Sequence, residues 1–129
     1  MSWILNKDNF LEIPFVGTDH AATGDVDLIG TDVGPYPWLP PGTLIEYMHF
    51  IVDEAFTSAG SATLAWGHGG DKTFASSTAK ALSALTKDAF FESNKSGFIT
   101  GSNRQLLATV GTAIFTAGKG RFLAKVRLT

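Results

Sequence analysis

Short hydrophobic runs alternate along the chain with turn-forming segments, a pattern that predicts many short β-strands and few helices. Glycine, proline, aspartate and serine recur between the runs, as in Pro40-Pro41-Gly42 and Ser58-Ala59-Gly60-Ser61. The runs of strand-like length are 10–16, 25–29, 43–56, 62–66, 98–100, 105–115 and 121–128. No unit of about 20–50 residues repeats, which excludes solenoids and propellers.

The last two runs differ in which of their faces are apolar. In 121–128 apolar residues alternate with mostly charged ones, which predicts a strand with one buried face. The run 105–115 is apolar on both faces, so we expect it either inside a sandwich or at a subunit contact. We expect Ala117-Gly118-Lys119-Gly120 to form a hairpin turn between the two runs. The residues expected to mediate self-association are Leu107, Ala113 and Phe115.

The longest run, 43–56, also alternates. Its predicted faces are Leu44, Met48, Phe50 and Val52 on one side, and Tyr47, His49, Ile51 and Asp53 on the other. One short helix is expected at about 73–85, because Asp71 can cap it and alanine and leucine favour helix there. Many strands with one short helix predict an all-β fold, a jelly-roll-like antiparallel β-sandwich.

Composition and charge narrow the possible partners. The 129 residues fit one compact domain, and only 17% of them are charged, against about 25% in an average protein. This shortage of charge indicates a large contact surface. The formal net charge of −2 gives no attraction to nucleic acid or to an anionic membrane. Cysteine is absent, which excludes disulfides, thiol catalysis and cysteine-based metal sites.

The sequence gives no sign of a secretory leader or a membrane span. Its first residues lack the basic region and long apolar stretch of a signal peptide. The most apolar segment, 44–56, carries Glu46, His49, Asp53 and Glu54, which argues against a membrane span. We therefore expect a protein that is made in the cytoplasm and has no membrane partner.

No residue pattern in the chain matches an enzyme. His49 is expected to be a satisfied strand histidine, and His20 has no partner at metal-ligand spacing. The glycine-rich segment around His68 matches no phosphate-binding loop and is expected to form a tight turn. The acidic residues lack calcium-loop spacing, and no G-x-S-x-G elbow occurs. We therefore expect no catalytic residue, no metal and no cofactor.

Aromatic residues are concentrated in the N-terminal part of the chain. Either they cover the ends of the sandwich, or they form a contact surface framed by prolines. The contact candidates are Trp3, Ile4, Leu5, Phe10, Tyr36, Trp38 and Leu39. We accordingly interpret 1–40 as an N-terminal arm with the first strands, which acts as a contact segment, and 41–129 as the sandwich body.

From Pro41 onward, turns and strands follow in a characteristic order. A proline–glycine turn opens a long strand at Pro41-Gly42-Thr43-Leu44-Ile45, and Glu54-Ala55-Phe56-Thr57 ends it. An Ala-Thr-Leu strand at 62–64, a glycine-rich turn at 67–71 and an alternating C-terminal strand follow. Over 41–128 this order resembles the capsid decoration (cement) proteins and head-fibre-type proteins of tailed bacteriophages.

The resemblance implies a structural protein of the virion. Such proteins are usually jelly-roll-like, are often homotrimers, and stabilise the capsid by bridging major capsid protein subunits on its outer surface. The partner implied is the major capsid protein, without cofactor, nucleic acid or membrane. The alternative is a carbohydrate-binding β-sandwich of a host-attachment apparatus, in which Tyr36, Trp38 or Trp66 would stack on sugars.

Overall fold

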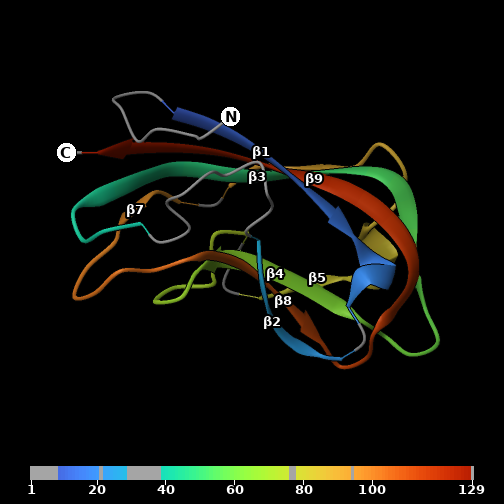
Figure 1. Cartoon of the computed structure of the whole chain (residues 1–129). Helices are drawn as coiled ribbons and strands as arrows, with labels where there is room; N and C mark the ends of the chain where they lie inside the picture. Colours follow the sequence, from blue (N-terminus) through green and yellow to red (C-terminus); the bar gives the residue numbers. More distant parts are fainter. Residues whose placement is uncertain (1–8, 21, 29–38, 76–77, 94, 129) are drawn as a thin grey trace.

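The computed structural model describes residues 9–20, 22–28, 39–75, 78–93 and 95–128. These residues form two antiparallel β-sheets stacked as two layers (Figure 1). Sheet A has the order β1-β9-β3-β6, with β7 also paired to β3, and sheet B has the order β2-β8-β4-β5. The all-β sandwich expected from the sequence is confirmed.

The strands have the following bounds. In sheet A they are β1 (Asn9–Val16), β3 (Thr43–Ser58), β6 (Phe90–Phe91), β7 (Gly97–Phe98) and β9 (Phe115–Leu128). In sheet B they are β2 (Gly24–Asp27), β4 (Thr63–His68), β5 (Lys80–Ala81) and β8 (Leu106–Gly111). Two short 3-10 turns, η1 (Gly17–Asp19) and η3 (Leu82–Ala84), are the helical elements of the described residues. β1 pairs with β9 and β2 with β8, so the described strands before residue 40 belong to the two sheets.

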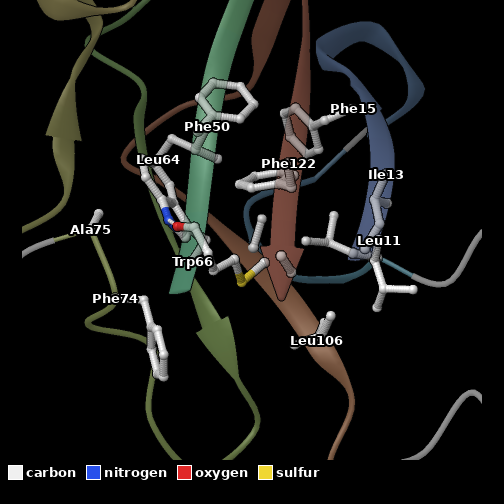
Figure 2. Close-up of a cluster of buried hydrophobic side chains, with 14 of the residues drawn as sticks. Leu11, Ile13, Phe15, Phe50, Leu64, Trp66, Phe74, Ala75, Leu106 and Phe122 are labelled. Carbon is white, nitrogen blue, oxygen red and sulfur yellow. Dashed lines mark hydrogen bonds between the residues drawn. The ribbon is translucent and has the colours of Figure 1, made fainter. Parts of the chain in front are cut away.

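Aromatic rings from both sheets fill the space between the layers (Figure 2). The rings of Phe50 on β3 and Phe122 on β9 have centroids 4.5 Å apart. Trp66 of β4 reaches across from sheet B, 5.4 Å from Phe50 and 5.5 Å from Phe122. Phe15 of β1 lies 5.7 Å from Phe122, and all four side chains are buried. Burial of these large apolar rings is the main contribution to the core.

An extra residue in β3 changes which side chains face the core. Ile45 pairs with Val126 of β9 and Tyr47 pairs with the preceding residue of β9, so Glu46 forms a β-bulge. Strict alternation predicted Leu44 on the inner face, and this is wrong, because the bulge turns Ile45 inward and leaves Leu44 half-buried. Beyond the bulge the prediction is confirmed: the buried residues of the inner face are Met48, Phe50 and Val52.

β9 continues through the segment predicted to be a hairpin turn. Lys119 and Gly120 lie inside the strand and pair with β1 on one side and with β3 on the other. A Cβ at Gly120 would overlap the Phe50 ring and lie 2.7 Å from the carbonyl oxygen of Ile51. A Cβ at Gly118, which has φ +127°, would overlap the Phe56 ring. The turn prediction is wrong because these glycines make room for rings of β3.

The chain crosses from sheet B to sheet A between β8 and β9. β8 ends at Gly111, Thr112 has a positive φ of 70°, and β9 starts at Phe115. Phe115 is buried, and its ring lies 4.9 Å from that of Phe56. The predicted run 105–115 therefore contains the end of one strand and the start of another. This crossing explains why Phe115 is apolar without requiring a subunit contact there.

The short helix expected at about 73–85 is not present in the described residues 73–75 and 78–85. Lys80 and Ala81 pair with β4 as strand β5, and the 3-10 turn η3 follows. Phe74 and Leu85 on either side of β5 are fully buried. Pairing with β4 and burial of these two side chains outweigh the helix propensity of the alanine-rich sequence.

Candidate functional site

A row of aromatic rings crosses the outer face of sheet A, which is the face turned away from the core. Phe10 of β1 lies 6.5 Å from Tyr47 of β3, between ring centroids. Tyr47 stacks on His49 at 4.2 Å with an interplanar angle of 7°, and His49 lies 5.3 Å from Phe90 of β6. We call Phe10, Tyr47, His49 and Phe90 the aromatic row. Its rings come from three strands, β1, β3 and β6, and β9 lies between β1 and β3, so the row crosses the whole width of the sheet.

Much of this face is accessible to solvent. Among the described residues four large hydrophobic side chains are exposed, and three of them lie on this face. Their exposed fractions are 67% for Phe10, 51% for Phe90 and 54% for Phe98, which pairs with Leu44 on β3. Single exposed hydrophobic residues are ordinary in proteins, but a group on one sheet face indicates a contact surface.

The charged side chains on this side of sheet A pair with one another. The Arg121 guanidinium donates hydrogen bonds to Asp53 at 2.9 and 3.1 Å and to Glu12 at 3.0 Å. Further ion pairs join Lys119 to Glu54 at 3.5 Å, Lys125 to Glu46 at 3.5 Å and Arg127 to Glu46 at 3.4 Å. Four cations of β9 thus face four carboxylates, and the formal charges cancel. Most of these pairs are solvent-exposed, so they neutralise the face more than they stabilise the fold.

His49 is fixed as a flat, uncharged ring within the aromatic row. The backbone N–H of Ser93 donates a 2.8 Å hydrogen bond to Nδ1 of His49, which places the proton of the neutral imidazole on Nε2. Burial lowers the pKa of His49, and the nearby charge of Glu92 opposes this shift only in part. This is the structural role predicted for His49 from its place in a strand.

The outer face of sheet B has a different character. Apart from Leu107, which is buried, its side chains on the central strands are small or polar, and Thr63, Ala65 and Thr109 alternate with the core residues of β4 and β8. Asp25 on β2 accepts hydrogen bonds from Lys72 at 2.8 Å and from Thr109 at 2.7 Å, and the bond from Lys72 lowers the pKa of Asp25. The two outer faces of the sandwich are therefore unequal: one is aromatic and the other polar.

The glycine-rich segment after β4 forms the tight turn expected from the sequence. The backbones of His68 and Asp71 exchange two hydrogen bonds of 3.0 Å across it. A carboxylate oxygen of Asp71 accepts bonds from the N–H of Thr73 at 3.0 Å and from its hydroxyl at 2.6 Å, and Lys95 approaches to 2.6 Å. Burial alone would raise the pKa of Asp71, but the bonds from Lys95 and Thr73 lower it to about 2.

Two of the seven contact candidates lie among the described residues. Phe10 is exposed in the aromatic row, whereas Leu39 is buried and its backbone pairs with Arg104. The candidates outside the described residues are Trp3, Ile4, Leu5, Tyr36 and Trp38. Their contact role, and that of the whole segment 1–40, stays a prediction.

The self-association candidates are largely enclosed by the chain itself. Phe115 and Leu107 are buried within the single chain, and Ala113 is partly buried against the core. A role for these residues in self-association stays a prediction.

The other members of the outer face of sheet A were not predicted as contact residues. Tyr47 and His49 were predicted to share one face of the run 43–56, without a contact role. Phe90 and Phe98 were missed, because they lie on strands of two residues that give no alternation. The sequence signal that could have pointed to this surface is the pair of aromatic rings, Tyr47 and His49, on one face of a long strand.

Other kinds of site find little support in the described part of the chain. Trp66 is fully buried, so it is not available to stack on a sugar. The described residues contain no group of three or more His, Asp or Glu side chains that could hold a metal ion. They also form no helix of the length and apolar character needed to cross a membrane.

Comparison with known proteins gives matches among solved structures. Neither a protein-family model nor a curated protein matches the sequence. A chain in the acidic stable capsid structure of Helicobacter pylori bacteriophage KHP30 matches with a TM-score of 0.65 and 17% identity, covering 97% of this chain and 90% of that chain. A chain in the cyanophage Pam1 capsid asymmetric unit matches with a TM-score of 0.59 and 15% identity, covering 100% and 90%. At these identities the matches establish a shared fold, and both come from bacteriophage capsid structures.

Proposed function

We propose that this protein is a virion structural protein that decorates a bacteriophage capsid and bridges major capsid protein subunits on its outer surface. The observation that carries the proposal is the fold match with chains of two phage capsid structures over almost the full length of each chain. The motif order in residues 41–128 points to the same class of protein independently of the fold comparison.

A decoration protein stabilises a shell through mass action. If it binds the assembled shell and not the free subunits, binding lowers the free energy of the assembled state alone. This role needs a stable domain and a contact surface, and it needs no catalytic group. We propose a non-enzymatic protein without cofactor that acts as a homotrimer with the major capsid protein as its partner.

The charge distribution supports a protein partner over a nucleic acid. Binding to nucleic acid relies on basic side chains that are free to neutralise phosphates. On the outer face of sheet A the basic residues of β9 already pair with carboxylates, and aromatic rings lie exposed beside them. Exposed aromatic side chains within a neutral surface are typical of protein–protein contacts.

Binding to empty shells tests the proposal. Shells are assembled from the major capsid protein encoded in the same viral genome and sedimented with increasing amounts of the purified protein. We expect saturable binding at a fixed ratio to capsid subunits, and shells that withstand higher temperature once occupied. Free capsid subunits are the control and should bind weakly. Light scattering during size exclusion measures the subunit number and should give three copies.

Two results would overturn the proposal. One is the absence of binding to intact shells at any concentration of the protein. The other is equal binding to free subunits and to shells, which would remove the basis for stabilisation. A change in tryptophan fluorescence on addition of glycans, without binding to shells, would favour the carbohydrate-binding alternative.

A further inference from the structure

We infer that the outer face of sheet A is the surface that docks on the shell, with the aromatic row against an apolar, uncharged surface of the major capsid protein. The inference rests on the proposed function and adds which side of the molecule meets its partner. It follows from three observations on the described residues.

The first observation is the inequality of the two outer faces. Phe10, Phe90 and Phe98 expose half or more of their surface on sheet A. On sheet B the outward side chains of the central strands are small or polar, and the one large apolar residue there, Leu107, is already buried. Burial of apolar area drives most protein association. Of the two outer faces, the one on sheet A has that area to bury.

The second observation is that this face needs no charge from its partner. Arg121 is held by Asp53 and Glu12, and Glu46 approaches both Lys125 and Arg127. A highly charged partner surface would have to break these pairs or bury unpaired charge, and both are costly. An apolar, uncharged protein surface meets no such cost. Charge complementarity therefore selects that kind of partner.

The third observation is that the aromatic row is preorganised. The Tyr47 ring is stacked on His49, whose Nδ1 accepts the Ser93 N–H, and the Lys125 ammonium lies 5.2 Å from the centre of the Phe10 ring. Side chains that already hold their bound positions lose little conformational entropy on binding. A rigid apolar surface of this kind suits a fixed site on a shell.

A second copy of this chain is the competing occupant. If two copies paired through the outer face of sheet A, both aromatic rows would be buried between them. The outer faces left to meet the shell would then be the two polar ones of sheet B. Since decoration requires a shell-binding surface, we assign the aromatic face to the shell.

The test compares three groups of variants for binding to empty shells. The triple variant Phe10→Ser, Phe90→Ser and Phe98→Ser removes the exposed rings, and Phe→Leu at the same positions keeps apolar area. The control is Ile114→Ser, which changes the exposed hydrophobic residue outside this face. All altered side chains are exposed, so the fold should persist, and circular dichroism and melting temperature verify this.

We expect the serine triple variant to bind shells at least tenfold more weakly than the unaltered protein, the leucine variant to lose less, and Ile114→Ser to bind normally. Unchanged binding of a folded serine triple variant would overturn the docking surface and leave the proposed function intact. Failure of the unaltered protein to bind would overturn the proposed function itself. If the serine triple variant, and neither of the other variants, has a lower mass in solution than the unaltered protein, the face mediates self-association and the inference is overturned.

Discussion

The indole Nε1 of Trp66, on sheet B, donates a 2.7 Å hydrogen bond to the carbonyl oxygen of Met48, on sheet A. Both residues are fully buried. β6 pairs with β3 only at Phe50 and Ile51, and β7 pairs only with residues 44–45, so no described strand pairs with the edge of β3 between them. The Trp66 bond satisfies a carbonyl group in this gap and joins the two sheets.

We predict that Trp66→Phe lowers the free energy of unfolding by about 1–3 kcal/mol, since it leaves the Met48 carbonyl buried without a donor. Trp66→Ala should cost about 3–5 kcal/mol, because it also opens a cavity. Urea unfolding followed by circular dichroism measures both. Phe90→Leu, at an exposed position, is the control and should change stability by less than about 0.5 kcal/mol. Unchanged stability of Trp66→Phe would mean that the bond contributes nothing.

Gly120→Ala should destabilise the protein by about 1–3 kcal/mol or more, because the added methyl group overlaps the Phe50 ring and lies 2.7 Å from the Ile51 carbonyl oxygen. The matched control is Gly69→Ala, where the nearest atom, on Arg104, is 3.5 Å from the added carbon. That variant should unfold within about 0.5 kcal/mol of the unaltered protein. Equal stability of the two variants would show that β9 has room for a side chain at Gly120.

Acidification should weaken the fold through Asp71. Its pKa lies at about 2 in the folded protein, below the 3.8 of an unperturbed aspartate, so its contribution to stability is full above pH 4 and is lost as the pH falls toward 2. Asp71→Asn keeps an oxygen for the Thr73 N–H but loses the ion pair with Lys95. It should cost about 1 kcal/mol at pH 7, a value reduced for solvent screening because both side chains of the pair are more than one third exposed.

Melting temperatures of Asp71→Asn and the unaltered protein between pH 7 and pH 2 test this prediction. The difference between them should narrow as the pH falls below 4. The control is Glu54→Gln, which removes a carboxylate from the exposed pair with Lys119 and should have little effect at any pH. A difference in melting temperature that stays constant down to pH 2 would contradict the stabilising role assigned to the ionised Asp71.

Binding to shells should depend weakly on salt. The ion pairs on the outer face of sheet A join residues of the same chain. Docking of the aromatic row therefore forms no new charge pairs with the shell. Raising sodium chloride from about 50 to about 500 mM should change the apparent affinity by less than about threefold. Sedimentation at several salt concentrations measures this. A loss of tenfold or more would indicate that the protein docks through charged groups.

Much of the fold could be predicted from the alternation of apolar and polar residues along the chain. The places where tertiary packing overrides this pattern could not be predicted. The strands at 10–16 and 43–56 were predicted close to their observed bounds, because each has one buried and one polar or mixed face, whereas the run 121–128 covers only the second half of β9. The bulge at Glu46 could not be predicted, since an extra residue in one strand is defined only by its partner strand. Gly118 and Gly120 were interpreted as a turn because their neighbours in space, Phe56 and Phe50, are distant in sequence.

The candidate surface was harder to predict for the same reason. Phe10 was selected as a contact residue, yet its neighbours Tyr47 and Phe90 come from strands that pairing brings together across 80 residues of sequence. Trp66 was considered for sugar stacking as one of the aromatic residues of the carbohydrate-binding alternative. Its burial depends on the opposite sheet, which no local pattern reveals.

The pairing of β1 with β9 has a mechanical consequence. Asn9 pairs with Val126 and Val16 with Lys119, so both ends of the chain leave the sheet at the same end of this strand pair. A load that pulls the two ends apart would open the pairs one after another from Asn9 inward, which is the weak direction of a β-sheet. A load spread across the strands of sheet A would instead be shared by all of them. Attachment through a broad face therefore suits a part that must withstand tension better than attachment through either terminus alone.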